Sequence, residues 1–415
     1  MSAVIIIWII SVLSIAGIII RPFRWPEAIW VVAGTILLLV MHLILPSEAL
    51  AGIRKGIDVY LFLTGMMLLA EVAREEKLFD WLAAHATQLA KGSGSRLFFM
   101  IYAVGTITTI FLSNDATAVV LTPAVAAVAK LAKVKKPLSY LYICAFVANA
   151  ASFVLPISNP ANLVIYGGDL PKLGQWLSQY FLASVAAIIV TYFLLRFSQR
   201  KNIMHPIEKN IRVPSLSVGG KTARIGIILT GMILLISSAY GINLGMPTAI
   251  AGLGTTLIVL LTTRHSPRAV IKGISWSILP LVAGLFVIVE ALNKTGIIGA
   301  MSHIVNNSAA KSTTLTAWKS GTFIALVSNL INNLPSGLIA GNVIQVSHAP
   351  VLIKNFILVG VDLGPNLSVT GSLATILWLV ALRRENEGIK AFTFLKLGIV
   401  IMLPALFAAF AALLL

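Results

Sequence analysis

Apolar segments long enough to cross a lipid bilayer recur along this chain, for example at residues 3–20, 28–45, 225–242 and 394–415. A hydrocarbon core of about 30 Å is crossed by a helix of roughly 20 apolar residues. Helices are favoured there because they satisfy their own backbone hydrogen bonds. With 58% hydrophobic and 11% charged residues, the 415-residue chain has more apolar surface than a soluble core would bury. The sequence therefore predicts an all-α polytopic membrane protein.

Charge and cysteine content exclude several classes of protein. The formal net charge is +17, but the basic residues gather between the apolar segments, where they set membrane topology. Nucleic-acid binding is therefore not indicated, and the lipid bilayer is the expected surrounding. The single cysteine, Cys144, excludes an intramolecular disulfide and a thiolate metal cage within one chain. We expect no metal, no cofactor and no ATPase site in this chain.

One polar interruption divides the chain into two halves. Residues 196–221 carry six basic residues and a single acidic residue, Glu208. By the positive-inside rule this segment is cytoplasmic. We therefore expect an N-terminal membrane repeat at residues 1–198, a cytoplasmic linker at 199–222 and a C-terminal membrane repeat at 223–415.

The other basic loops fall on the cytoplasmic side only if two apolar regions enter and leave the membrane on the same face. These regions, residues 97–132 and 313–346, are predicted to be re-entrant hairpins. Each half then has five spans, of which the fourth is broken, and the second half is inverted relative to the first. Both termini would lie outside the cytoplasm. Arg54 and Lys55 land on the outer side in this scheme, against the positive-inside rule.

Matched motifs support the repeat. Gly65 and Glu71 have the same spacing as Gly284 and Glu290, on the third span of each half. The pair Asn114-Asp115 matches Asn332-Asn333 near the hairpin tips. In the broken spans, residues 156–163 match residues 362–368. The three matches occur in the same order in both halves, which indicates duplication.

The hairpin tips and broken spans are the predicted site. A broken helix leaves backbone groups without partners, which hydrocarbon makes costly, so such breaks occur where protein or a wet cavity satisfies them. Their short polar side chains would cap half-helices and surround a small polar solute. The candidate substrate-binding residues are Ser113, Asn114, Asp115, Thr117, Ser158, Asn159, Asn162, Asn329, Asn332, Asn333, Asn366 and Ser368.

Ionisable side chains within membrane segments are costly, and each is a functional candidate for that reason. Asp115 is the first candidate for proton coupling because it lies in a hairpin tip. Glu71, Glu290, Asp58 and Asp362 are weaker candidates. Glu71 and Glu290 lie near span ends, which favours a structural or lipid-interface role for each.

Three segments, residues 111–123, 157–163 and 327–339, resemble the bacterial arsenite efflux permeases (ArsB) of the ion transporter superfamily, and the resemblance covers essentially the whole chain. It implies a multi-pass protein of the bacterial inner membrane that exports arsenite and antimonite, carried as arsenous and antimonous acid. Export would be driven by proton exchange, optionally with a cytoplasmic ArsA-type ATPase subunit. The resemblance also implies a homodimer.

The residues at the breaks are compatible with that cargo. Arsenous acid is neutral at pH 7 and offers hydroxyl groups, which suit amides, hydroxyls and one carboxylate. A dicarboxylate would favour an Arg clamp, and the broken regions contain neither Arg nor Lys. Two alternatives stay open, a Na+/H+ antiporter and an organic-anion carrier. An enzyme is disfavoured because no nucleophile or metal motif has the usual spacing.

Overall fold

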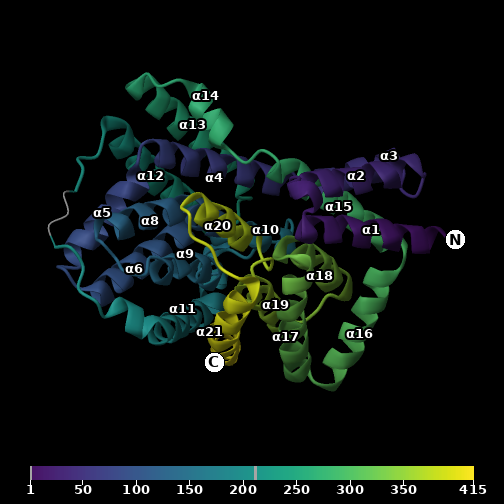
Figure 1. Ribbon diagram of the computed structural model, residues 1–415. Coiled ribbons are helices and arrows are strands. Elements are labelled where there is room, and N and C mark those ends of the chain that lie inside the picture. Colours follow the sequence, from purple (N-terminus) through teal and green to yellow (C-terminus); the bar gives the residue numbers. More distant parts are fainter. Residues whose placement is uncertain (1, 210–212) are drawn as a thin grey trace.

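The computed structural model describes residues 2–209 and 213–415, so residues 210–212 of the predicted linker lie outside the described residues. Within these ranges the named elements are all helices (Figure 1). The first half contains α1 (Ala3–Ile20), α2 (Glu27–Val40), α3 (Pro46–Lys55), α4 (Ile57–Glu75), α5 (Leu78–Leu89), α6 (Gly94–Leu112), α7 (Asn114–Ala116), a π-helical turn (Thr117–Leu121), α8 (Thr122–Leu131), α9 (Leu138–Ala150), a 3-10 turn (Pro156–Ser158), α10 (Pro160–Tyr166) and α11 (Leu173–Ile203).

The second half follows the same order of elements. It contains α12 (Val218–Tyr240), α13 (Gly245–Thr263), α14 (Pro267–Gly273), α15 (Ile278–Lys294), α16 (Ile297–Lys311), α17 (Thr313–Ile331), α18 (Asn333–Ser347), α19 (Val351–Leu363), a 3-10 turn (Gly364–Leu367), α20 (Leu373–Arg384) and α21 (Ala391–Ala412). Figure 1 places α5, α6 and α8 on one side of the molecule and α16, α17 and α18 on the other, with α10 and α20 between them.

Seven of the described helical segments are long and apolar enough to cross a membrane, or eight if the bent pair α3–α4 is one span. This number is lower than the ten predicted spans for a physical reason. The broken spans consist of short helices, and α2 has only 14 residues. One of the seven, α6, is an arm of the first predicted hairpin. The multi-pass helical class is confirmed, while the inverted orientation of the second half stays a prediction.

Glycine allows close packing in the helix layer that borders the site. Gly65 of α4 faces the backbone of α13 at Thr248, and Gly252 of α13 faces the backbone of α4 at Gly65. A Cβ atom at either glycine would overlap these backbone atoms. Small residues let membrane helices approach closely, where van der Waals packing replaces the missing hydrophobic drive. The contact holds α4 firmly against α13.

The two hairpins have matching helices and matching breaks. Both α6 and α17 have 19 residues, begin after a serine N-cap and end at a residue with positive φ. Those residues are Ser113 (φ 97°, ψ 160°) and Asn332 (φ 73°, ψ 153°). The backbone therefore pairs Ser113 with Asn332, and by the same register it pairs Asp115 with Leu334. The sequence match of Asn114-Asp115 with Asn332-Asn333 was wrong by one residue.

Candidate functional site

The first hairpin tip is formed by an abrupt break at Ser113. Its side chain caps the following turn by accepting a hydrogen bond from the Ala116 amide at 3.5 Å. Thr117 braces the break, since its hydroxyl donates to the Ser113 carbonyl at 3.2 Å and lies 2.9 Å from the Thr109 hydroxyl. The region of φ and ψ that Ser113 occupies is essentially restricted to glycine and costs on the order of 1–3 kcal/mol. Such strain persists where the surroundings determine the conformation.

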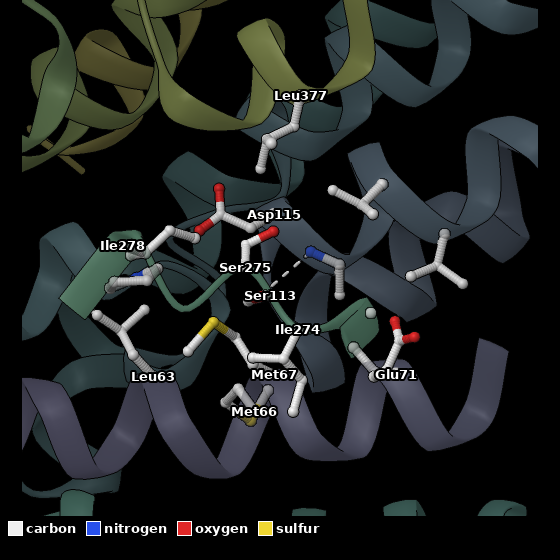
Figure 2. Close-up of a pocket in the computed structure, with 16 residues that line it drawn as sticks. Leu63, Met66, Met67, Glu71, Ser113, Asp115, Ile274, Ser275, Ile278 and Leu377 are labelled. Carbon is white, nitrogen blue, oxygen red and sulfur yellow. Dashed lines mark hydrogen bonds between the residues drawn. The ribbon is translucent and has the colours of Figure 1, made fainter. Parts of the chain in front are cut away.

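Asp115 lies beside a cavity of about 60 Å³, large enough for small polar molecules such as water. Figure 2 shows Asp115 and Ser113 in the middle of this cavity, with Met66 and Met67 of α4 on one side and Leu377 of α20 on the other. We call it the Asp115 cavity. No lysine or arginine lines it among the described residues. Two carboxylates and two serine hydroxyls supply its polar side chains: Asp115, Glu71, Ser113 and Ser275.

Glu71 is the second acid of the Asp115 cavity. Its side chain is only 6% exposed and is held by Arg74, whose Nε donates to Oε2 at 3.0 Å and whose guanidinium donates to Oε1 at 2.5 Å. Gly273 leaves room for this carboxylate, because a Cβ at residue 273 would overlap it. Of the two roles expected for Glu71, structural or lipid-interface, its burial and ion pair fit the structural one. A buried carboxylate of this kind is held by its cation partner.

The second tip has different chemistry. The Asn332 side chain caps α18 by accepting from the Leu334 amide at 3.3 Å, and its amide donates to the Thr370 carbonyl at 3.3 Å. Asn329 donates to the Gly364 carbonyl at 3.0 Å. Both side chains therefore bind the loop of the second broken span. Leu334, the counterpart of Asp115, lines a cavity of only about 10 Å³. The two tips are not equivalent, and only the first offers a carboxylate to an open space.

A buried polar network connects the two broken spans. Asp362 accepts hydrogen bonds from Asn159 and from Ser152, both at 2.8 Å. In the same direction, the amide of Asn149 donates to the Asn366 side chain at 3.0 Å, and the Asn366 amide donates back to the Phe146 carbonyl at 3.0 Å. Asp362 is fully buried and has no cation partner among the described residues. This network ties the halves together and fixes Asn159, which caps α10 by accepting from the Ala161 amide at 3.0 Å.

Other predicted residues satisfy backbone groups at the breaks. Asn162 donates to the Ser152 carbonyl at 2.9 Å, and Ser158 donates to the Ile110 carbonyl at 3.0 Å. The Ser368 hydroxyl lies 3.3 Å from that of Thr370. These contacts satisfy groups that hydrocarbon would leave unpaired.

Several amide oxygens at the breaks are buried without a partner. They belong to Asn114, Asn149, Asn162, Asn329 and Asn333. Asn114 and Asn333 occupy corresponding places in the two tips and are 1% and 2% exposed. A buried polar atom without a partner is costly and marks places where water or a bound solute would be stabilised.

The structure thus divides the predicted site residues among separate environments. Ser113 and Asp115 line the Asp115 cavity together with Glu71. Asp58 and Glu290 line a different and larger cavity. The other predicted residues lie in the polar network or bind groups at the breaks, except Asn114 and Asn333, which are buried in the two tips.

Sequence reasoning missed Ser275, Asn149 and Ser152. Ser275 lies in the short connection between α14 and α15, next to a basic loop, where a serine gives no signal. Asn149 and Ser152 follow the apolar run that contains Cys144, and a polar residue at that depth was the available signal.

Comparison with known proteins shows the family. Residues 3–361 match the family model described as citrate transporter (CitMHS). The chain is 30% identical over 362 residues to an arsenical pump membrane protein of Escherichia coli, covering 84% of each protein. It is 26% identical over 428 residues to a putative arsenical pump membrane protein of Bacillus subtilis (strain 168), covering 92% of each.

Two solved transporters share the fold. The YdaH transporter of Alcanivorax borkumensis superimposes with a TM-score of 0.57 at 15% identity, covering 88% of this chain and 86% of that one. MtrF of Neisseria gonorrhoeae superimposes with a TM-score of 0.53 at 14% identity, covering 88% and 82%. The chain is thus a multi-pass inner-membrane transporter that belongs to the citrate transporter (CitMHS) family and is related to the arsenical pump membrane proteins.

Proposed function

We propose that this chain exports arsenite and antimonite from the cytoplasm in exchange for protons, and that the Asp115 cavity is where the cargo binds. One observation carries the proposal: the cavity combines carboxylates and serine hydroxyls with no lining cation. Arsenous acid is neutral and carries three hydroxyl groups. Its hydroxyls would donate to Asp115 and accept from Ser113 and Ser275, which gives a neutral trihydroxy solute a full set of partners.

Asp115 is the proposed proton-exchanging group. Its carboxylate has no ion-pair partner among the described residues and lies half-buried at the cavity. A carboxyl group in this position gains and loses a proton without breaking a salt bridge. Glu71 is a weaker candidate because it is ion-paired with Arg74. Three other acids are also weaker candidates. Asp362 and Asp58 accept hydrogen bonds from neutral donors, and Glu290 is ion-paired with Lys55.

The name of the matching family raises citrate as an alternative cargo. A tricarboxylate needs cationic partners, and bidentate Arg contacts are the usual solution. The two acids of the Asp115 cavity would repel it. These same acids would suit a sodium ion, so a Na+/H+ antiporter is the alternative that transport assays must separate from arsenite export.

The proposal includes the inverted arrangement of the two halves and a possible homodimer. The equal lengths of α6 and α17 and the matching breaks at Ser113 and Asn332 support duplication. A cytoplasmic ArsA-type ATPase, if present, would meet the basic surface that includes residues 264–272 and the described parts of the linker.

Purified protein in proteoliposomes under an imposed pH gradient tests the function. We expect uptake of arsenite and antimonite when the gradient is present, and its collapse when an ionophore removes the gradient. Citrate should not be transported. Sodium flux that needs a pH gradient and no arsenite would overturn the proposed cargo in favour of Na+/H+ exchange.

A further inference from the structure

A second and larger cavity, of about 590 Å³, lies at the other end of α4. Its walls come from the start of α4, the end of α10 and one face of α18. It reaches Gly168 and Asn243, which belong to the connections that follow α10 and α12. Because Asn342 of α18 faces it, we call it the Asn342 cavity.

The charges of the Asn342 cavity balance. Its lining includes two basic residues, Arg54 and Lys55, and two acidic residues, Asp58 and Glu290. Lys55 and Glu290 form an ion pair at 2.7 Å, and Asp58 accepts from the Gly245 amide at 2.8 Å. A cavity without excess charge does not concentrate anions or cations, so it suits the passage of a neutral hydroxylated solute. The pairing also neutralises Lys55, which the predicted topology places on the outer side against the positive-inside rule.

The two cavities approach each other along the same two helices. On α4, Leu61 lines the Asn342 cavity and Leu63 lines the Asp115 cavity. On α10, Leu163 lines the Asn342 cavity and Pro160 lines the Asp115 cavity. With a rise of 1.5 Å per residue, these pairs are separated by roughly 3 and 4.5 Å along their helices. Along each helix, the linings of the two cavities are therefore less than one helical turn apart.

The barrier is apolar and closely packed. Leu63 and Leu163 are 3% and 1% exposed, and Phe62 between the leucines of α4 is fully buried. Such a plug stops water and hydrated ions because it offers no hydrogen-bond partners. Opening this barrier would require α10 and α4 to move relative to each other, because the leucines belong to these two helices. The Gly65 and Gly252 contact holds α4 against α13, and the contact of Gly341 with the Ile165 backbone holds α10 against α18. Opening would therefore move α10 together with α18 relative to α4.

We propose that the Asn342 cavity is the second vestibule of the transport path, reached from the membrane face opposite that of the Asp115 cavity. Leu61, Leu63 and Leu163 form the gate between the two vestibules. This inference rests on the proposed function, since it assigns the route by which the cargo of the Asp115 cavity leaves.

Sided cysteine labelling tests the vestibule. The background is Cys144→Ala, because Cys144 is the only cysteine and is fully buried. Asn342→Cys is the test variant, since its side chain bonds only the Leu338 carbonyl of its own helix. Ser275→Cys, in the Asp115 cavity, is the matched variant for the opposite face. Right-side-out and everted vesicles are treated with a membrane-impermeant maleimide, and arsenite flux is measured before and after labelling.

We expect Asn342→Cys to react at least tenfold faster from one face and Ser275→Cys from the other. Labelling of Asn342→Cys should reduce arsenite flux by at least tenfold, because the adduct fills the vestibule after the protein has folded. An unreactive Asn342→Cys, labelling of both variants from the same face, or labelling without loss of flux would each overturn the proposal. Sided labelling, together with no arsenite flux through the unlabelled Cys144→Ala background protein, would contradict the proposed cargo alone. The effect of labelling Asn342→Cys would then be measured on the flux of the ion that is carried.

Discussion

The side-chain amide of Asn159 donates a 2.8 Å hydrogen bond to the carboxylate of Asp362, joining the broken span of one half to that of the other. The second carboxylate oxygen accepts from Ser152 at 2.8 Å. The fully buried Asp362 is thus held by neutral donors alone among the described residues. Since Asn159 also caps α10, this contact positions the helix whose first residue, Pro160, lines the Asp115 cavity.

Replacing Asp362 should weaken this contact between the two broken spans, by an amount that depends on the substitution. Asp362→Ala leaves the buried amide donor of Asn159 unpaired, at a cost of about 1–3 kcal/mol, whereas the Ser152 hydroxyl keeps the Asn149 carbonyl as an acceptor at 2.8 Å. Asp362→Asn keeps one acceptor oxygen and should cost less. The measurement is thermal unfolding in detergent, in which the order of stability should be wild type, Asp362→Asn, Asp362→Ala. Equal unfolding temperatures for the three proteins would contradict the bridging role.

Close packing between α4 and α13 predicts a contrast between two glycines of one helix. A Cβ at Gly252 would overlap the backbone of Gly65, whereas a Cβ at Gly254 meets nothing within 4 Å. Overpacking typically costs about 1–3 kcal/mol, and backbone atoms have no room to move aside. Gly252→Ala should therefore lower the unfolding temperature. Gly254→Ala, the matched control, should leave it unchanged or raise it, since alanine is the better helix former. Equal unfolding temperatures for the two variants would contradict close packing between α4 and α13.

Much of the architecture follows from the sequence because its causes are local. Apolar segment length predicts α1, α12 and α21. The basic residues around residues 97–132 predict a hairpin with a tip, and the structure has α6 and α8 in this region with a break at Ser113. These signals come from the membrane itself, which imposes length and polarity on each segment separately.

The sequence does not predict which of these polar residues lie together in the structure. The pairs Asn114-Asp115 and Asn332-Asn333 are similar in sequence. The helix breaks nevertheless fall at Ser113 in one half and at Asn332 in the other, so the backbone pairs Asp115 with Leu334. The place of a break depends on the packing of both arms. The contact of Asn149 with Asn366 joins residues far apart in the chain, so no local pattern predicts it.

The strained tip predicts a stabilising substitution. Ser113 occupies backbone angles that glycine adopts freely, and relief of this strain is worth on the order of 1–3 kcal/mol. Ser113→Gly loses its cap, which costs only a few tenths of a kcal/mol when glycine is the replacement. We therefore expect a net gain of about 1 kcal/mol by thermal unfolding. Ser93→Gly is the matched control, since Ser93 caps α6 with φ −100° and has no strain to relieve. A gain at both positions, or at neither, would contradict stored strain at the tip.

The proposed proton-coupled transport predicts that the carboxylate of Asp115 is essential. Asp115→Asn keeps the size of the side chain but removes the exchangeable proton and the charge-assisted contact to a hydroxyl of the cargo. Such contacts contribute about 1.5–3 kcal/mol, so proton-driven arsenite uptake into everted vesicles should fall roughly tenfold or more. Asp115→Leu, which copies Leu334 of the second tip, should abolish uptake.

The control for the Asp115 variants is Asp169→Asn, because Asp169 is an exposed acid in the connection after α10 and lines neither the Asp115 cavity nor the Asn342 cavity. It should retain wild-type uptake, and all the variants should unfold near the wild-type temperature so that loss of transport is not loss of fold. Full proton-driven uptake by Asp115→Asn would move the coupling role to another acid. Glu71 would then be the next residue to replace, since it is the other carboxylate of the same cavity and Arg74 would have to release it on each turnover.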